Sequence, residues 1–410
     1  MAWMTRAVWA MLALAVGAAR GGDDEISRIR ARVAERMGRT PNYTCVETVE
    51  RRWYSDEFAA SGVRDRLRFE VAVIGGQEQF SWPGGSRFDS RDLQEVVGHG
   101  VSKTGDFSGF LSHIFTLDAA AYKRIGELEA AIQPAIRYDY GVPASSGYAL
   151  SRNGVAAVVG FHGSFWVDPA TLELSRLEIE TDGIPPELHT SSARLAIDYG
   201  VVAVGAGSFL LPRAADVRLV SDRGLESRTI TRFTQCRQFL AESSIAFEDR
   251  PVEQVAKKSD GGAELPEGVI LEVALTTPID RKSAATGDVI TAEVRKEAKV
   301  KGGIVVPKGA VIEGRIVLLE TRGAALEPYD LLTLRFTKLR GGAGQIDLRA
   351  GAIRCGAGYR VPAGLPREAA SGLRGISPRS PMNFSGGFVE LPKGLALTLQ
   401  TEAVAARSAP

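Results

Sequence analysis

The stretch Tyr148-Ala-Leu-Ser-Arg-Asn-Gly-Val-Ala-Ala-Val-Val-Gly-Phe161 decides how the first half of the chain folds. Its Asn-Gly dipeptide favours a two-residue hairpin turn, because both turn positions take positive φ angles. We therefore expect Tyr148–Arg152 to pair antiparallel with Val155–Phe161. Further turn signals at Asp168-Pro169 and Asp222-Arg223-Gly224 separate the strands that follow. The region around this hairpin is predicted to be an antiparallel meander.

Two helical segments accompany these strands. Apolar residues recur at helical spacing in residues 23–37, so one face of a helix there is expected to be buried. A second helical patch follows Asp106, its expected cap, and runs to Phe115. One helix, several strands, an inserted helical patch and a further meander predict an α+β fold with a single large curved sheet.

The composition changes near residue 250. Nine of the 11 lysines follow this point, and all five tryptophans precede it. Residues 249–263 are polar and rich in turn formers, which predicts a linker between a domain of residues 23–248 and a domain of residues 264–406. The alternative is a long surface loop within one domain.

The second domain repeats one short pattern. Pro266-Glu267-Gly268, Pro307-Lys308-Gly309 and Pro392-Lys393-Gly394 each precede an alternating apolar run. Proline presets the first turn angle and glycine takes the positive φ, so each pattern predicts a turn that leads into a strand. Together with the other strands of this half, they predict a small all-β barrel or sandwich.

The chain contains three cysteines, Cys45, Cys236 and Cys355, and none forms a C-x-x-C pair. Their spacing therefore supports neither a metal site nor thioredoxin-like chemistry. Cys45 lies at the first predicted strand and Cys236 lies just after the last strand of the meander. A curved sheet that brings its two ends together would join them in a disulfide. The alternative is two buried free thiols.

Residues 1–20 have the pattern of an export signal. Arg6 precedes the short apolar run Ala7–Ala18, which small residues follow. Cleavage would leave a periplasmic or secreted protein; the alternative is an uncleaved membrane anchor. No later segment is apolar over 18 residues, so no transmembrane span is expected in the mature chain. The formal net charge of +1 gives no reason to expect nucleic acid as a partner.

The first half resembles the periplasmic lipoprotein-carrier superfamily, the outer-membrane lipoprotein-sorting proteins and their relatives. The resemblance covers residues 23–247 and rests on the helix, the strand Tyr43-Thr44-Cys45-Val46-Glu47 and the hairpin Phe165-Trp166-Val167-Asp168-Pro169 before Leu172–Glu178. It implies a half-open antiparallel β-barrel with packing helices whose concave side holds acyl chains. The resemblance does not identify any functional residue in this chain.

The second half is similar to the β-barrel of conjugal-transfer and type IV secretion channel proteins of the TrbI type. The matching segments are Leu265–Gly268, Thr277-Pro278-Ile279-Asp280 and Val305–Gly314, in that order, and the match covers residues 264–320. The resemblance implies an all-β barrel that docks to another envelope component. A shared fold does not establish a shared role.

The sequence gives little sign of chemistry. His99, His113, His162 and His189 are isolated from one another and show no metal-ligand spacing, so no metal site is predicted. There is no nucleophile elbow and no complete phosphate-binding glycine motif, so neither an enzyme nor a cofactor is expected. Glu173, Glu178, Glu180 and Asp198 are typical of the solvated face of a strand.

One group of aromatic residues is a candidate lining for an apolar cavity between the sheet and the helices. Its members are Trp82, Phe107, Phe110, Phe115, Phe161, Phe165 and Trp166. Pockets for small molecules are usually concave and apolar, which these side chains would provide. The alternative is a plain hydrophobic core.

These observations favour an exported, non-enzymatic envelope protein. Its N-terminal half-barrel would bind a lipid or lipidated peptide, and residues 264–406 would contact another envelope protein. A structural or accessory protein without a ligand is the second hypothesis, and it predicts a filled N-terminal concavity. A hydrolase with an unrecognised site is the third, and it requires a histidine beside a carboxylate and a hydroxyl in a cleft.

Overall fold

The computed structural model describes residues 24–54, 62–85, 88, 107–128, 134–152, 154–239, 265–300, 305–323, 328–341, 344–355, 382–385 and 389–402. The predicted signal peptide (1–20) and linker (249–263) lie outside these residues. Contacts divide the chain into two compact units, which are described separately below. The N-terminal unit comprises Met1–Val49, Val71–Gln79 and Val101–Leu240, and the C-terminal unit comprises Glu50–Glu70, Phe80–Gly100 and Ala241–Pro410.

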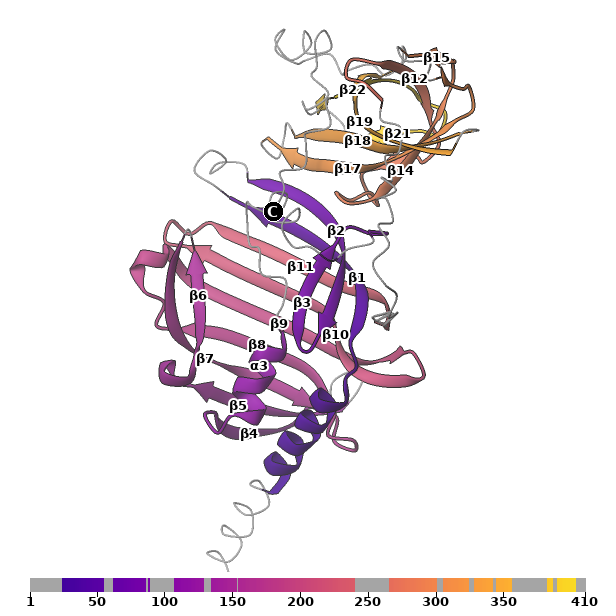
Figure 1. The fold of residues 1–410 in the computed structure, drawn as a ribbon. Coiled ribbons are helices and arrows are strands. Elements are labelled where there is room, and N and C mark those ends of the chain that lie inside the picture. The colour runs from indigo at the N-terminus through magenta and orange to yellow at the C-terminus, as the bar shows by residue number, and fades with distance from the viewer. Residues whose placement is uncertain are drawn as a thin grey trace, which may run out of the picture. The chain divides into compact units, whose positions relative to one another are not determined.

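The N-terminal unit is built on a curved antiparallel sheet (Figure 1). Its strands pair in the order β4 (Ala121–Leu128), β5 (Ala135–Val142), β7 (Val155–Val167), β8 (Leu174–Asp182), β9 (Thr190–Val204), β10 (Gly207–Ser221) and β11 (Glu226–Gln238). The predicted hairpin is confirmed, because β6 (Tyr148–Arg152) pairs with the first residues of β7. The ladder is therefore the predicted meander, in which neighbouring strands follow one another in the sequence except that β6 comes between β5 and β7.

The sheet continues beyond β11 through strands from the start of the chain. β1 (Tyr43–Trp53) pairs with β11 and with β2 (Val63–Ile74), and β2 pairs with β3 (Gln77–Ser81). A disulfide joins Cys45 of β1 to Cys236 of β11, with 4.1 Å between the Cα atoms. The predicted bridge is confirmed, and it fastens the first strand to the last strand of the meander.

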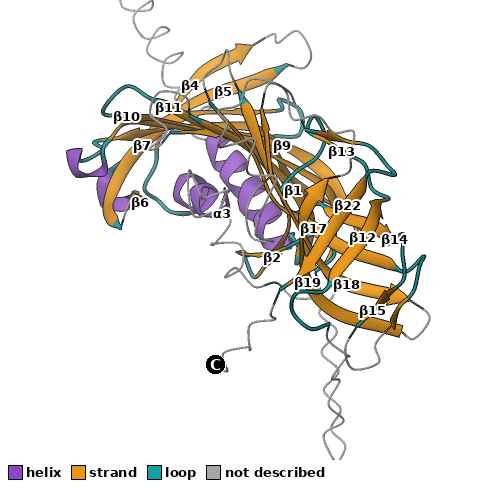
Figure 2. Ribbon diagram, turned by 90° about the horizontal axis from the view of Figure 1, so that it is seen from above, coloured by secondary structure: helices purple, strands orange, loops and turns teal. Residues whose placement is uncertain are grey.

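The helices lie on the concave side of this sheet (Figure 2). The first covers residues 24–39, close to the predicted 23–37. The predicted second patch forms α3 (Phe107–Leu111), which continues into the π-helical turn Ser112–Thr116. Ile29 and Val33 of the first helix are buried in the same core as Ile114 of the second. No helix among the described residues combines the length and hydropathy needed to span a membrane.

Ion pairs and hydrogen bonds hold the first helix against the sheet. At its start, the Glu25 carboxylate accepts a hydrogen bond from Tyr138 and lies 2.8 Å from the Arg124 guanidinium. At its other end, Arg32 lies 2.7 Å from Glu173, which also accepts hydrogen bonds from Arg36. The helix is thus fixed at both ends as well as along its buried face.

The C-terminal unit contains a closed antiparallel barrel. β12 (Ile270–Leu275), β14 (Val289–Val294), β17 (Val311–Arg322), β18 (Tyr329–Gly341), β19 (Gly344–Cys355) and β22 (Ala396–Thr401) pair in this order, and β22 closes the ring on β12. The three predicted turns precede β12, β17 and β22, with Gly268, Gly309 and Gly394 at φ angles of 84°, 86° and 87°. The predicted fold class, α+β with a C-terminal all-β barrel, is confirmed.

Short strands complete this unit. β13 (Ile279–Asp280) pairs with β21 (Glu390–Leu391), β15 (Ala298–Lys299) pairs with β16 (Val305–Val306), and β20 (Met382–Ser385) pairs with β18. The part of β2 in this unit pairs with β17 at Asp65 and Glu320. The described residues 50–54, 62–70 and 80–85 fall within the predicted domain of residues 23–248, but their contacts assign them to the barrel unit.

We expect the disulfide to contribute strongly to stability. Replacing both Cys45 and Cys236 with serine should lower the free energy of unfolding by about 4–5 kcal/mol, because the bridge closes a long loop in the unfolded chain. Urea unfolding followed by circular dichroism measures this change. An unchanged midpoint for the double variant would contradict the expectation.

The anchor at Glu25 should make the stability depend on pH. Burial raises the pKa of this carboxyl, but hydrogen bonds from Tyr138 and Arg124 lower it, and the net pKa is below 4.5. The stabilisation is therefore present above pH 4.5 and is lost as the pH falls through the folded-state pKa. In thermal melts, Glu25→Gln should be less stable than the natural protein above pH 5. The two melting temperatures should converge as the pH falls below 4.5 and through the folded-state pKa, and a constant difference would count against this role.

Candidate functional site

The inner face of the N-terminal sheet changes in character from one edge to the other. Residues that lie opposite one another on neighbouring strands share a face, so the register defines rows of inward side chains. One row runs Tyr138, Phe165, Leu177, Ile197, Ala215, Thr231 from β5 to β11, and the next runs Tyr140, Gly163, Ile179, Leu195, Val217, Thr229. Side chains are thus aromatic near β5 and β7, aliphatic on β8 and β9, and small or hydroxylated on β11.

The aromatic half of this face is filled by the protein itself. Phe165 has no exposed surface; its ring stacks on Tyr138 at 5.2 Å between centroids and contacts Phe115 edge-on at 5.0 Å. Phe161, also without exposed surface, contacts Phe110 of α3 edge-on at 5.7 Å. These contacts form a packed core between the sheet and the helices.

The structure brings four of the seven predicted lining residues together. Phe110, Phe115, Phe161 and Phe165 meet in the aromatic half, as described above. Phe107 begins α3, but its side chain lies outside the described residues. The two tryptophans lie elsewhere, for different reasons.

Trp166 and Trp82 have other surroundings than the four phenylalanines. Trp166 follows Phe165 in β7, so strand alternation turns it to the opposite face, where Arg137 and Arg176 lie 5.6 and 6.0 Å from its ring centroid. Trp82 belongs to the C-terminal unit, where its ring lies 5.7 Å from that of Phe69. Neither tryptophan is a member of the core that contains Phe161 and Phe165.

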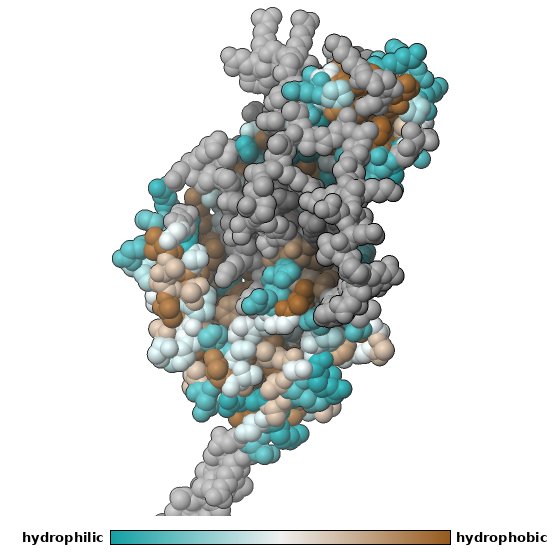
Figure 3. Space-filling view, in the orientation of Figure 1, coloured by the Kyte–Doolittle hydropathy of each residue, from teal (hydrophilic) through white to brown (hydrophobic). Residues whose placement is uncertain are grey.

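A second set of inward residues remains partly exposed. Leu195, Val217 and Leu219 face the concave side but are only half-buried, and Leu210 packs against the edge of the same core. We call Leu195, Leu210, Val217 and Leu219 the open half of the inner face. Figure 3 shows a hollow beside α3 with hydrophobic residues on its walls. The inner face therefore combines a buried core, which includes the aliphatic Leu177 and Ile197, with the few partly exposed aliphatic side chains of the open half.

Sequence reasoning missed the open half, although a signal for it was present. The strands of Leu195 and Val217 were expected, and in both strands these residues alternate with the charged side chains Arg194, Asp216 and Arg218. That alternation identifies inward positions. The aromatic residues are more conspicuous in the sequence. Their large rings fill the concave space themselves, so they do not line a cavity there.

Few polar atoms face this interior. Tyr140 donates a hydrogen bond to the Glu178 carbonyl oxygen at 2.9 Å. The Tyr199 hydroxyl is buried in the core, and among the described residues it has no hydrogen-bond partner. Burial raises the pKa of Tyr199 far above its ordinary value of 10.0, so this phenol stays protonated and is available as a donor. Thr229 and Thr231 add buried hydroxyls at the β11 end.

Of the four histidines, His99 lies outside the described residues, and His162 and His113 lie on different sides of the sheet. His162 lies on the outer face beside Asp182, at 2.8 Å, and both side chains are about half exposed. His113 contacts the Phe161 ring edge-on in the aromatic core. Within the described ranges, no three acidic, histidine or cysteine side chains are grouped to hold a metal ion. The chemistry that this face offers is the binding of apolar groups.

Comparison with known proteins gives a distant likeness in fold. No protein-family model and no curated protein matches the chain. A DUF1329 family protein from Desulfovibrio piger is 9% identical over 55% of this chain and 96% of its own, with a TM-score of 0.28. A LolA superfamily protein from Nitrosomonas europaea is 8% identical over 54% and 97%, with a TM-score of 0.27. An outer-membrane lipoprotein-sorting protein domain from Vibrio parahaemolyticus is 7% identical over 54% and 94%, with a TM-score of 0.24.

Two of these three structures bear names of the superfamily that residues 23–247 resemble. With TM-scores this low, the likeness supports no argument about function. None of the three is a conjugal-transfer protein, so the resemblance of residues 264–320 stays a prediction. The functional argument therefore rests on the geometry of the inner face.

Because Phe165 and Trp166 are neighbours with opposite orientations, they test the packing of the aromatic half directly. Phe165→Ala should lower the free energy of unfolding by about 3–5 kcal/mol, since it removes a fully buried ring. Trp166→Ala removes a partly exposed ring and should cost about 1 kcal/mol. Urea unfolding of the two variants gives the comparison. Equal losses would show that the aromatic half is not the core of this unit.

Proposed function

We propose that this protein is a non-catalytic binding protein of the cell envelope, and that its N-terminal unit holds an acyl chain of a lipid or lipidated peptide against the open half. The observation that carries the proposal is the partial exposure of Leu195, Val217 and Leu219 on the inner face of a curved sheet. Inward aliphatic side chains normally become fully buried, and a ligand would complete that burial.

The chemistry of the open half suits an acyl chain. Aliphatic side chains would bind an acyl chain through the hydrophobic effect, which contributes about 25 cal/mol for each Å² of apolar surface removed from water. The buried aromatic half next to them provides a rigid apolar floor, because its rings are interlocked. Few polar groups intervene, which is the usual composition of a pocket for an apolar ligand.

The compartment follows from two features of the chain. Residues 1–20 have the pattern of an export signal, and the bridge between Cys45 and Cys236 is of a kind that persists in oxidising compartments. Both support a periplasmic or secreted protein. Within the envelope, we propose that residues 264–406 contact a second protein, as the resemblance of residues 264–320 implies.

The filled aromatic half favours a second candidate, a structural or accessory protein without a ligand. Phe115, Phe161 and Phe165 are fully or almost fully buried without any added molecule, so this part of the concavity needs no ligand to be stable. If the open half is closed in the same way by parts of this protein or by a partner, no acyl chain would bind. The two candidates differ in one measurable property, the uptake of acyl probes.

The titration of a fluorescent fatty acid into the mature protein decides between them. The acyl-binding proposal predicts saturable binding that Val217→Asp weakens by at least about tenfold, because a carboxylate would be placed against the apolar chain. Val158→Asp is the matched control: the same substitution on the same unit, at a valine that is already 63% exposed. It should leave the affinity unchanged.

Circular dichroism confirms that both variants are folded before they are compared. If both substitutions weaken probe binding equally, the open half is not the binding site. If no probe binds the natural protein and no lipid is extracted from it, the acyl-binding proposal fails and the structural candidate replaces it.

A further inference from the structure

The hairpin that joins β9 to β10 contains a long uncharged stretch. From Tyr199 to Pro212 the sequence has no aspartate, glutamate, lysine or arginine, although 24% of the residues of the chain are charged. The ends of hairpins are usually polar, because their side chains face water. We call residues 199–212 the apolar hairpin. The lack of charge at its exposed positions needs a physical reason.

The two strands of the apolar hairpin pair with each other at the end of their ladders. β8 pairs with β9 as far as Asp198, and β11 pairs with β10 as far as Ala214. Beyond these residues, β9 and β10 continue across a two-residue turn in which Gly205 has a φ angle of 60°. In the described part of the sheet, no further strand pairs with either of them here. The outer edges of the hairpin therefore keep backbone groups that need water.

One face of the apolar hairpin packs against the protein. Gly200 lies opposite Leu211, and Val204 lies opposite Gly207, so these residues share a face. Val204 and Leu211 are each only 2% exposed. The side chain of Gln238 also lies against Gly205 at the turn. This face holds the hairpin in place.

The other face is exposed and equally free of charge. Val201 lies opposite Leu210, and Ala203 lies opposite Ser208. Val201 is 57% exposed, Ala203 and Ser208 are exposed, and Leu210 is half-buried. Ala206 extends this surface to the turn. The exposed face thus consists of small aliphatic side chains and one hydroxyl.

The exposed face of the hairpin is continuous with the proposed acyl site. By strand alternation, Leu195, Ile197, Tyr199 and Val201 of β9 point to the same side of the sheet. Leu195 belongs to the open half, and so does Leu210 on the neighbouring strand. No charged side chain lies among these inward positions of β9. An acyl chain could therefore move from the hairpin to the open half along apolar surface.

An unpaired cation stands where the uncharged stretch ends. Arg213 is exposed, and among the described residues it has no acidic partner. The stem of its side chain lies over Gly200, where an added Cβ would be 2.4 Å from the Arg213 Cδ. Asp198, the nearest charged residue on the other strand, is paired with Arg176. The base of the hairpin thus offers one positive charge, which suits the phosphate of a lipid headgroup.

We propose that the apolar hairpin inserts its exposed face into the headgroup layer of a lipid bilayer, and that an acyl chain passes from this bilayer over Val201 and Leu210 to the open half. The unpaired strand edges keep the hairpin in the hydrated layer, because backbone groups without partners are not tolerated in the hydrocarbon core. The route of the chain rests on the proposed acyl site, whereas the contact with the bilayer does not need it.

The chemistry of the exposed face favours lipid over protein as its partner. Protein interfaces depend on a few large anchors, most often Trp, Tyr and Arg, that fill fitted pockets. The exposed face of the hairpin has no such anchor, and its small aliphatic groups contribute through apolar area alone. A surface of this kind gains free energy at the boundary between headgroups and acyl chains, where burial of apolar surface needs no specific shape.

Co-sedimentation of the mature full-length protein with vesicles tests this proposal. With vesicles of phosphatidylcholine and phosphatidylglycerol, the natural protein should bind, and Val201→Asp should weaken binding by at least about tenfold, because it places a carboxylate in the headgroup layer. Arg213→Gln should weaken binding to these vesicles by about fivefold. It should leave binding to pure phosphatidylcholine unchanged.

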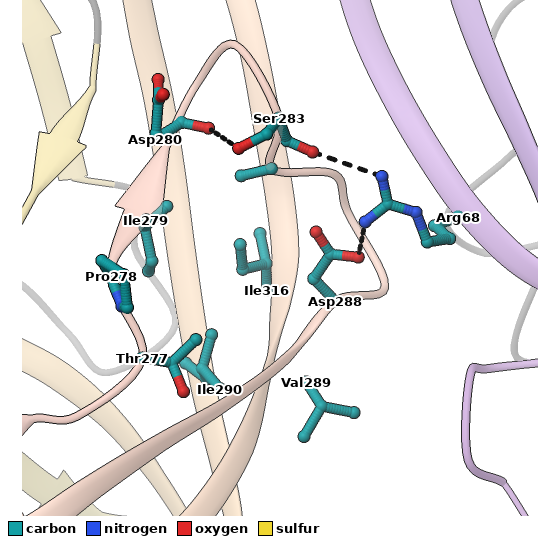
Figure 4. A pocket seen from close by; sticks show the side chains of 11 residues that line it. Arg68, Thr277, Pro278, Ile279, Asp280, Ser283, Asp288, Val289, Ile290 and Ile316 are labelled. Atoms are coloured by element: carbon teal, nitrogen blue, oxygen red, sulfur yellow. Dashed lines mark hydrogen bonds and ion pairs between the residues drawn. The ribbon is translucent and has the colours of Figure 1, made fainter.

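Two exposed valines serve as matched controls. Val158 is 63% exposed and lies on the same unit, outside the hairpin. Val289 is 39% exposed and lines a pocket of the C-terminal unit (Figure 4). Val158→Asp and Val289→Asp should both bind vesicles like the natural protein. Circular dichroism confirms that all variants are folded.

Two results would overturn the proposal: no co-sedimentation of the natural protein, or equal losses in the three aspartate variants. Vesicle binding is measured without an acyl probe, and the fatty-acid titration is measured without vesicles. A failure of the bilayer contact and a failure of the acyl site are therefore separate results.

Discussion

The packing of Phe115 and Tyr138 around Phe165 is the interaction on which the N-terminal unit depends. It joins the short helical segment to the middle of the curved sheet, and the first helix completes the same core through Ile29 and Val33. Large rings can fill the space under a curved sheet only where the helices lie over it. The core extends from these rings over Leu177, Ile197 and Ala215, and the partly exposed inward residues of the open half lie beside it.

The two parts of the inner face therefore differ in what they contribute to the protein. The aromatic half packs the sheet against the helices, while the open half packs against the edge of this core and keeps part of its apolar surface exposed. The disulfide between Cys45 and Cys236 also stabilises this sheet, because it holds β1 beside β11. The barrel of the C-terminal unit is closed on itself, because β22 pairs with both β12 and β19.

Much of the fold could be predicted from local sequence signals. The turn at Asn153-Gly154, the three Pro-x-Gly turns and the helical spacing of residues 23–37 each determine a local conformation with little help from tertiary contacts. The opposite orientations of Phe165 and Trp166 also follow from strand alternation alone, and the sequence analysis did not apply it. The place of Trp82 and the boundary between filled and open halves depend on which distant elements pack together, so no local pattern encodes them.

Photo-crosslinking would test the central claim most directly. A fatty acid with a diazirine at the end of its acyl chain would be bound to the mature protein and irradiated, and the labelled residues would be identified by mass spectrometry. The account predicts labels on inward residues of β9 and β10, at or beside Leu195, Val217 and Leu219. Labels confined to the outer face around Trp166, or none that an unlabelled fatty acid competes away, would contradict it.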